Sequence, residues 1–364
     1  MSEDLQQYAN MPLKQLPNRV WRTYEGGALI DKWKKDSPQV DGTMPEEWIM
    51  STITARGKNR PEEEGLSIIS TPSGNKTLKE LVDSNIKLFL GEKHAAKYGS
   101  TGVLIKMLDS LDRLTIQVHP DKAYARTMLN SEFGKTESWY VLDNREINGE
   151  KSAVYLGFKE GVTKQKWTEY FESQNTAAML NCLHKIEVKP GDAFMIYGGV
   201  PHAIGSGCFL MEVQEPTDYT MRVEKTTPKG LTIGDELIHQ GVGIENMLNC
   251  FHYDTYSIDQ ALSNWKIIPE LLDSSNEYVL KTIFNEKHTD CFGLNELELK
   301  GTYQLTNNGG FFVAVIYSGD GHIICNDKEY SYSQGDEIFF SAAIDAITFQ
   351  SKSESKILLC YPPK

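Results

Sequence analysis

The sequence predicts a mainly β protein in which two barrels are accompanied by inserted and connecting helices. Three observations support this fold class. Short β-prone segments bounded by glycine turns occur on both sides of a helical stretch, apolar residues at helical spacing are limited to a few segments, and one Gly-Asp turn with its following strand occurs twice. At 364 residues, the chain is long enough for two such units.

The first β-rich part, residues 1–230, contains the inserted helices. Residues 76–98 carry apolar side chains at helical spacing, with Thr77 as the expected N-cap, and residues 163–183 are mostly helical in pattern. Strands are expected on both sides of a turn at DSLD (109–112), and again in the β-branched and aromatic segments ESWYVLD and SAVYLGF. We interpret this part as a barrel with helical insertions.

The second β-rich part, residues 276–364, follows a helical connector over residues 231–275. Its segment SQGDEIFFSAAIDAI aligns with KPGDAFMIYGGVPHAI in the first part, so that the two Gly-Asp turns coincide and Ala346 lies opposite His202. We therefore expect one barrel that can bind a metal and a second barrel that keeps the scaffold but lacks the metal ligands.

The charge balance and the cysteines restrict the class of function. A formal net charge of -13 argues against nucleic-acid binding and against binding to an anionic membrane, although a few local cations could still hold a small phosphorylated ligand. No apolar signal segment begins the chain, no apolar run reaches the roughly 18 residues of a membrane span, and the six cysteines include no CxxC pair. We expect a cytoplasmic protein with free thiols, either a monomer or a weak homodimer.

Four residues from three turn-bounded β segments could form a metal site. In IQVHP (116–120), Gln117 and His119 are two residues apart, so both side chains point to the same face of a strand. Glu137 begins a β-prone run in GKTESWY, and His202 is flanked by glycines in GGVPHAIG. Two imidazoles, a carboxylate and an amide oxygen suit zinc with an open coordination position, or another divalent first-row metal. Taken one at a time, each residue could instead be structural, as a strand-end histidine or a surface acid.

Two cations lie near these residues in the sequence. Lys135 precedes Glu137 by two positions, and Arg222 follows His202 in PTDYTMRV. Arginine can bind a phosphate or polarise a hydroxyl with its planar guanidinium, whereas lysine acts as a point charge. A simple solvated charge is the alternative for each of them.

The segments IQVHPDKAYA, GKTESWY, PGDAFMIYGGVPHAIGSG and PTDYTMRV, in this order, resemble the signature segments of the type I mannose-6-phosphate isomerases, a family of zinc-dependent cupins. The resemblance extends from about residue 17 to the C-terminus. It implies two cupin (jelly-roll) barrels, of which the first, within residues 1–230, is catalytic. It also implies one Zn²⁺ per chain, bound by Gln117, His119, Glu137 and His202.

The same resemblance implies roles for four further residues. Lys135 and Arg222 match the active-site lysine and arginine of the family, with Lys135 also able to contact substrate. Thr115 falls where members place a small hydroxyl residue near the phosphate, and Trp48 resembles a tryptophan beside the substrate. The implied reaction interconverts mannose 6-phosphate and fructose 6-phosphate through a cis-enediol, and the residues do not identify the general base.

Two segments depart from the usual pattern of the family. QEPTDYTMRVEK carries Glu215 and Pro216 where members have polar neutral residues, and MPEEWIMSTITARG stands where members commonly carry a Gly-Glu-x-Trp-like stretch. Both segments are expected near the rim of the substrate site, so an isomerase for a related sugar or sugar phosphate stays open. A non-catalytic sugar-binding cupin is the other alternative, because the second barrel already lacks the histidine.

Overall fold

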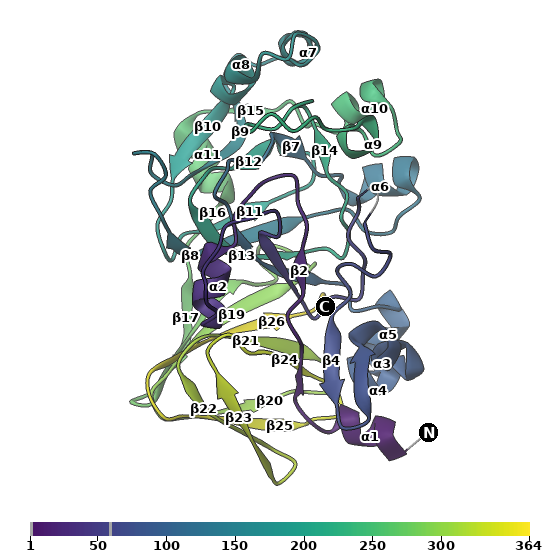
Figure 1. The fold of residues 1–364 in the computed structure, drawn as a ribbon, viewed down its shortest axis with the longest axis vertical. Helices are drawn as coiled ribbons and strands as arrows, with labels where there is room; N and C mark the ends of the chain where they lie inside the picture. The colour runs from purple at the N-terminus through teal and green to yellow at the C-terminus, as the bar shows by residue number, and fades with distance from the viewer. Residues whose placement is uncertain (1–2, 58–59) are drawn as a thin grey trace.

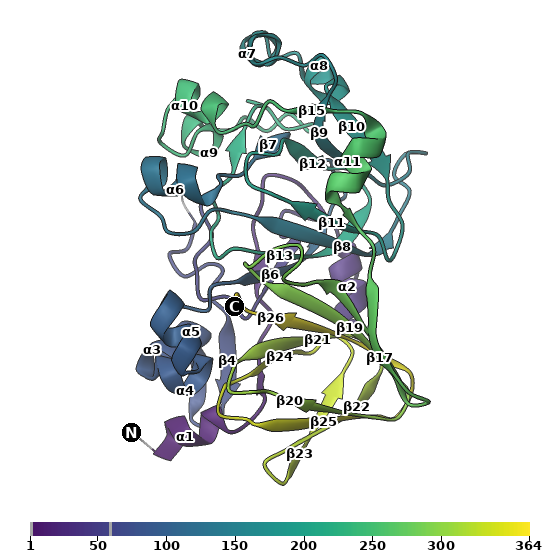
Figure 2. The same cartoon turned by 180° about the vertical axis from the view of Figure 1, so that it is seen from behind.

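The computed structural model describes residues 3–57 and 60–364 and confirms the predicted mainly β architecture. Two β-barrels lie one above the other along the long axis, as Figure 1 and Figure 2 show from opposite sides. Helices cover the outer end of the first barrel and one flank of the second. Within the described ranges, no helix is long and apolar enough to cross a membrane.

The first barrel consists of two sheets around a buried apolar core, and its strands are antiparallel apart from β15. Its large sheet contains, in spatial order, β16 (Lys266–Ile267), β11 (Ala193–Ile196), β8 (Glu137–Asn144), β13 (Cys208–Gln214), β6 (Leu104–Asp109), β3 (Glu46–Ile49) and β2 (Arg19–Val20). Its small sheet contains β10 (Leu183–Glu187), β9 (Ala153–Lys159), β12 (His202–Ile204), β7 (Gln117–Val118) and β14 (Met221–Arg222), with β15 (Thr255–Tyr256) beside β9.

The second barrel repeats this arrangement of strands. Its large sheet contains, in spatial order, β1 (Leu13–Lys14), β24 (Glu337–Phe340), β21 (Phe312–Ser318), β26 (Ser355–Tyr361), β19 (Gly293–Leu299), β18 (Tyr278–Phe284) and β17 (Glu270–Ser274). Its small sheet contains β23 (Lys328–Ser333), β22 (Asp320–Cys325), β25 (Ala346–Ser351) and β20 (Thr302–Thr306). The central strands β11, β8 and β13 therefore correspond in order to β24, β21 and β26. Strand β1 comes from the N-terminal segment, so the chain contributes to the second barrel before it builds the first.

The large sheets of the two barrels pack against each other. Met107 and Met211 of the first barrel share one buried core with Leu294 and Leu358 of the second. The sulfur atoms of Met211 and Cys360 lie 3.8 Å apart across this contact. Because both faces of β13 are buried, its sequence CFLMEVQ lacks the alternation of apolar and polar residues that marks a half-exposed strand.

The predicted helix over residues 76–98 is divided into three short helices, α3 (Leu78–Ser84), α4 (Ile86–Leu90) and α5 (Glu92–Tyr98). Thr77 caps α3 as predicted, because its hydroxyl accepts from the Glu80 amide and the Glu80 carboxylate accepts from the Thr77 amide. The first break is at Asn85, whose φ is -160°. The second is at Gly91, where φ is +88° and a Cβ atom would lie 2.2 Å from the Gly309 carbonyl oxygen.

The other helices are short; α1 precedes the first strand and the rest lie in loops between strands. They are α1 (Glu3–Ala9), α2 (Ala28–Lys34), α6 (Lys122–Leu129), α7 (Lys164–Glu172), α8 (Thr176–Asn181), α9 (Asp235–Ile238), α10 (Ile244–Asn249) and α11 (Ile258–Trp265). A separate hairpin of β4 (Ile68–Thr71) and β5 (Gly74–Thr77) precedes α3. All six cysteines are buried and free, as the sequence predicted.

Candidate metal centre and its cavity

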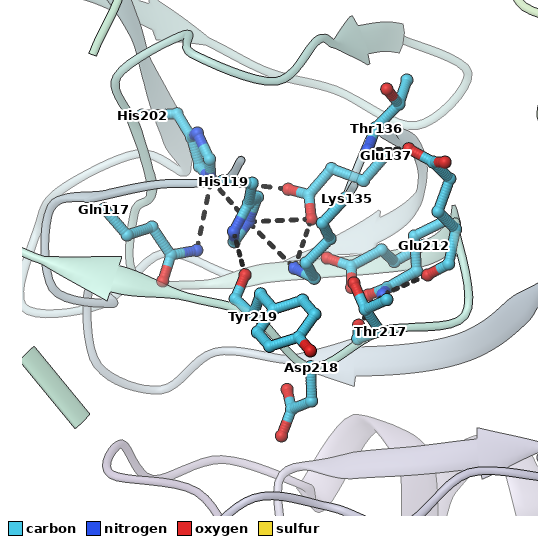
Figure 3. A network of polar contacts seen from close by, with 12 residues as sticks. Gln117, His119, Lys135, Thr136, Glu137, His202, Glu212, Thr217, Asp218 and Tyr219 are labelled. Atoms are coloured by element: carbon cyan, nitrogen blue, oxygen red, sulfur yellow. Dashed lines mark hydrogen bonds and ion pairs between the residues drawn. The ribbon is translucent and has the colours of Figure 1, made fainter. Parts of the chain in front are cut away.

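Strand pairing in the first barrel brings the four predicted metal ligands together. Gln117 and His202 are partners in register between β7 and β12. His119 follows the last residue of β7, and Glu137 is the first residue of β8. The side chains therefore converge from three separate segments of the chain, as Figure 3 shows.

Glycines let the loop before β12 approach the end of β7 closely. A Cβ atom on Gly198 would lie 2.5 Å from the backbone nitrogen of Asp121. The Gly199 amide donates a hydrogen bond of 2.8 Å to the His119 carbonyl. The segment that leads to His202 is thus held against the segment that carries His119.

His119, Glu137 and His202 form a fully buried cluster, and one ligand atom from each lies within 4.8 Å of the others. The Nε2 atoms of the two imidazoles are 3.2 Å apart. His119 Nε2 lies 3.0 Å from Glu137 Oε2, and His202 Nε2 lies 3.5 Å from Glu137 Oε1. The amide nitrogen of Gln117 is 3.2 Å from His202 Nε2, so the predicted binding through its oxygen requires the amide to turn over.

Backbone carbonyls determine which ring nitrogens can bind a cation. Nδ1 of His119 donates to the Tyr219 carbonyl at 2.9 Å, and Nδ1 of His202 donates to the Val200 carbonyl at 2.9 Å. A carbonyl can only accept, so in neutral rings both Nε2 atoms carry a lone pair. Two lone pairs and a carboxylate that face the same buried point repel each other unless a cation lies among them. This donor set fits a divalent metal, with ring orientation fixed by the outer hydrogen bonds.

The charge states of the cluster agree with this donor set. Burial, with a contribution from the Lys135 ammonium, lowers the pKa of His119 to about 3. Burial also lowers the pKa of His202. Burial opposes ionisation of Glu137, but the Lys135 ammonium beside it holds the pKa of this carboxyl well below its usual range. The rings are therefore neutral and the carboxylate is charged near pH 7.

Lys135 lies directly beside the cluster. Its ammonium donates to His119 Nε2 at 2.9 Å and to Glu137 Oε2 at 2.6 Å. These are two of the atoms that would bind a metal, so the ammonium and a metal ion compete for them. Lys135 also lines the adjoining cavity, which places its charge between the candidate metal centre and the space for a ligand.

A narrow cavity of about 30 Å³ adjoins the metal centre. Three predicted site residues besides Lys135 line it, namely Thr115, Gln117 and Arg222. Five further charged residues of its lining were not singled out from the sequence. They are Arg22, Glu46, Lys106, Glu212 and Asp218.

The missed residues form a continuous ionic network. Lys106 Nζ lies 2.8 Å from Glu212 and 3.8 Å from Glu46, and Arg22 lies 2.8 Å from Glu46 and 3.5 Å from Asp218. A signal for two of them was present in the sequence. A lysine within VLIKMLD and a glutamate within FLMEVQ are charges in otherwise apolar strands, and charges are rarely buried without a partner.

Arg222 is a half-buried cation with an unusual set of partners. Its Nη1 atom donates to the carbonyls of Thr220 at 3.1 Å and Leu237 at 2.8 Å. No carboxylate of the described residues lies within ion-pair distance of it. Burial lowers the pKa of Arg222 to about 10, so it remains charged at neutral pH. Its strand pairing opposite Gln117 places it next to the metal centre.

Trp48 lies behind the cavity wall and does not line the cavity. Its ring is fully buried, packs against Val20 and Leu104, and donates from Nε1 to Glu46 at 2.8 Å. The Arg22 guanidinium lies 4.9 Å from the centroid of the Trp48 ring, so the tryptophan supports a cavity residue from behind. The family resemblance had implied a position beside the substrate.

Glu215, one of the residues that depart from the usual pattern of the family, also lies outside the cavity lining. Its carboxylate accepts from the Thr136 amide at 2.9 Å, and burial raises its pKa. The residue is 1% exposed and holds the segment before Glu137 in place. The expectation that this substitution changes the rim of the substrate site is therefore wrong for Glu215.

Comparisons with known proteins agree with the resemblance seen in the sequence. Residues 15–150 match the family model of the phosphomannose isomerase type I catalytic domain, and residues 281–360 match that of the mannose-6-phosphate isomerase cupin domain. The chain is 26% identical over 280 residues to mannose-6-phosphate isomerase ManA of Bacillus subtilis, covering 76% of this chain and 80% of the relative. It is 25% identical over 294 residues to the mannose-6-phosphate isomerase of Streptococcus mutans, covering 79% and 85%.

Solved structures confirm the two-barrel fold. Mannose 6-phosphate isomerase from Bacillus subtilis superposes with a TM-score of 0.71 at 22% identity, covering 96% of this chain and 99% of the other. A variant of phosphomannose isomerase from Salmonella typhimurium gives a TM-score of 0.73 at 13% identity, covering 97% and 100%. At these identities the structural likeness establishes the fold.

Proposed function

This chain belongs to the type I phosphomannose isomerase family, and from that premise we propose that it interconverts mannose 6-phosphate and fructose 6-phosphate. The observation that carries the proposal is the buried His119–Glu137–His202 cluster at the inner end of a cation-lined cavity. The family resemblance adds Gln117 as the fourth ligand and zinc as the metal. A zinc ion would stabilise negative charge that develops on the C1 and C2 oxygens of the substrate.

The cavity residues provide the other parts of the reaction. A base removes the C2 proton of the open-chain aldose, a cis-enediol forms, and the proton returns at C1. Lys135 and Arg222 line the cavity beside the metal centre, where their charges can stabilise the enediolate electrostatically. Thr115 also lines the cavity and is 4% exposed, so its hydroxyl is available to a bound ligand but not to bulk water.

Glu212 is our candidate for the general base. Its carboxylate lines the cavity and forms an ion pair of 2.8 Å with Lys106. Burial and the neighbouring Glu137 carboxylate raise the pKa of Glu212. A raised pKa brings a carboxylate closer to the value that a base needs near neutral pH.

Specificity for a phosphorylated sugar is supported by the charges of the cavity. Arg22, Lys106, Lys135 and Arg222 outnumber the three carboxylates of its lining. An excess of positive charge in a buried space favours an anionic ligand over a neutral sugar. Isomerisation of another aldose 6-phosphate fits the same lining. Non-catalytic sugar binding does not account for the buried His119–Glu137–His202 cluster.

A substrate panel with metal analysis tests the proposal. We expect about one zinc per chain and turnover of mannose 6-phosphate, measured in a coupled assay beside free mannose and other aldose phosphates. His119→Ala should abolish both metal binding and turnover while circular dichroism stays unchanged. His322→Ala, a control in the second barrel, should leave both unaltered. Zinc binding without turnover of any sugar phosphate would favour the binding protein, and full activity of metal-free protein would exclude the metal centre.

A further inference from the structure

Arg22 stands out among the cavity residues because part of its guanidinium has no hydrogen-bond partner. Its Nε atom donates to Glu46 at 2.8 Å and its Nη1 atom donates to the Trp21 carbonyl at 3.2 Å. Its Nη2 atom is buried and donates to no acceptor among the described residues, although Asp218 lies 3.5 Å away. A buried donor without an acceptor is unfavourable, and a ligand with an anionic oxygen would satisfy it.

The guanidinium is held rigidly in this position. Its central carbon Cζ lies over the Trp48 ring, 4.9 Å from the ring centroid, and the side chain is 10% exposed. The neighbouring carboxylates of Glu46 and Asp218 raise the pKa of Arg22 against the effect of burial, so the group stays charged. Arg22 is therefore a fixed cation that presents a free N–H group, and it requires little reordering to bind an anion.

The position of Arg22 separates it from the metal centre. Both the main cavity and a second, smaller cavity of about 10 Å³ are lined by Arg22, Thr23, Asp218 and Arg222. This outer cavity is also lined by Trp21, Arg56, Leu237 and Gln240, but Gln117 and Lys135 line the main cavity alone. The metal centre is thus at one end of the combined space and Arg22 at the junction with the outer cavity.

The charges at this junction suit an anionic group. Arg22 and Arg222 both line it, and Arg222 has no ion-pair partner among the described residues. Arg56 lines the outer cavity beside them, with its guanidinium over the Tyr219 ring at 4.3 Å from the centroid. Asp218 is the only carboxylate shared by the two cavities within the described ranges. Guanidinium groups bind phosphate oxygens with two parallel N–H donors.

We propose that Arg22 binds the phosphate group of the substrate, so that the sugar extends from this junction toward the metal centre. The inference rests on the proposed function, because it names the residue that reads the phosphate of that same substrate. Thr115, which the family resemblance places near the phosphate, lies in the main cavity together with Lys135. Arg22 therefore determines specificity for a phosphorylated sugar without taking part in proton transfer.

Replacement of Arg22 tests this role with inorganic phosphate as the probe. Arg22→Gln should weaken competitive inhibition by inorganic phosphate at least about 10-fold and raise KM for mannose 6-phosphate about 10- to 100-fold, with a smaller change in kcat. Arg22→Lys keeps the charge but not the planar guanidinium with its free Nη2 donor, and it should recover part of the loss. Arg60→Gln serves as the matched control, because Arg60 stacks on Trp21 at 5.4 Å but does not line either cavity.

The outcomes separate this inference from the proposed function. Unchanged phosphate inhibition in folded Arg22→Gln and Arg22→Lys variants would overturn the inference and leave the isomerase assignment intact. A 10- to 100-fold loss of kcat with unchanged KM would also overturn the inference, since that result indicates a structural or catalytic role. If the wild type binds inorganic phosphate through Arg22 but turns over no sugar phosphate, calorimetric titration of phosphate would support the anion site while the proposed function fails.

Discussion

The two barrels have the same scaffold but different interiors. Their large sheets have the same spatial order of strands, and β8 of the first barrel corresponds to β21 of the second. Glu137 is paired with Ile196 of β11, and at the matching place Phe312 is paired with Phe340 of β24. The position of the metal-centre carboxylate is thus taken by an aromatic ring in the second barrel.

The Gly-Asp turn that precedes β11 in the first barrel is reproduced in detail before β24 in the second. Gly191 and Gly335 both have positive φ values, 91° and 90°. The Asp192 carboxylate accepts from the Lys189 amide at 3.0 Å, as the Asp336 carboxylate accepts from Ser333 at 2.8 Å. The repeat found in the sequence is therefore structural, and the difference between the barrels arises from the side chains that face the interior.

The interior of the second barrel is filled with aromatic and aliphatic side chains. The rings of Phe312 and Phe340 are stacked at 4.6 Å with an interplanar angle of 6°, and Phe349 packs edge-on to Phe340 at 5.9 Å. Among the described residues, the only group that could hold a metal is the cluster of the first barrel. The same scaffold thus supports a polar site in one copy and a hydrophobic core in the other.

Removal of the carboxylate should have the largest effect. Glu137→Gln removes a charged ligand, so we expect more than about a 10³-fold loss of isomerase activity, together with loss of bound metal. The second barrel offers a matched control, because His322 and Glu329 also form a pair at 2.9 Å but lie at its surface. Glu329→Gln should leave activity and metal content unchanged. A similar loss of activity in both variants would contradict the assignment of catalysis to the first barrel alone.

Removal of the aromatic ring at the matching position should affect stability instead. Phe312→Ala leaves a cavity in a closely packed core, so we expect the free energy of unfolding to fall by about 3 to 5 kcal/mol. Denaturant unfolding measures this change. The activity of the molecules that remain folded should stay within about twofold of the wild type, and a large loss of kcat at full folding would show that the second barrel takes part in catalysis.

The paired turn glycines should give the smallest and most closely matched effects. Alanine at Gly191 or at Gly335 must adopt a positive φ, which costs about 1 to 2 kcal/mol of stability. A Cβ atom on Gly191 meets nothing within 4 Å, whereas one on Gly335 would lie 3.2 Å from Cα of Lys34. We therefore expect Gly335→Ala to be the more destabilising in thermal unfolding. The reverse order would show that the contact with Lys34 does not determine the cost at Gly335.

One detail of the repeat differs from the sequence alignment. Ala346 begins β25 as His202 begins β12, but the Ala346 side chain is exposed. The residue of β25 that faces the second core is Ile347, which is 1% exposed. Strand residues alternate between faces, so a shift of one position moves a side chain from the interior to the surface. The alignment could match the segments, but it could not determine which residue faces inward.

The chemistry of the site was only partly predictable. Gln117, His119, Glu137 and His202 were recognised from their motifs, and strand pairing brings them together. The ionic network of the cavity was not, because Arg22, Glu46 and Asp218 lie in unremarkable surroundings in the sequence and meet only in the folded chain. The position of Trp48 behind the wall depends likewise on packing with residues of neighbouring strands.

The sequence by itself determined the features that depend on neighbouring residues. These include the alternating β segments, the capping box at Thr77, the Gly-Asp turns and the motif that carries His119. Tertiary structure decided which side chains face the cavity, where the helix over residues 76–98 is interrupted, and that Arg22 has a free donor at the junction of two cavities. The physical reason is that local signals reflect the geometry of a few consecutive residues. Burial and ion pairing depend on contacts between strands that are far apart in the chain.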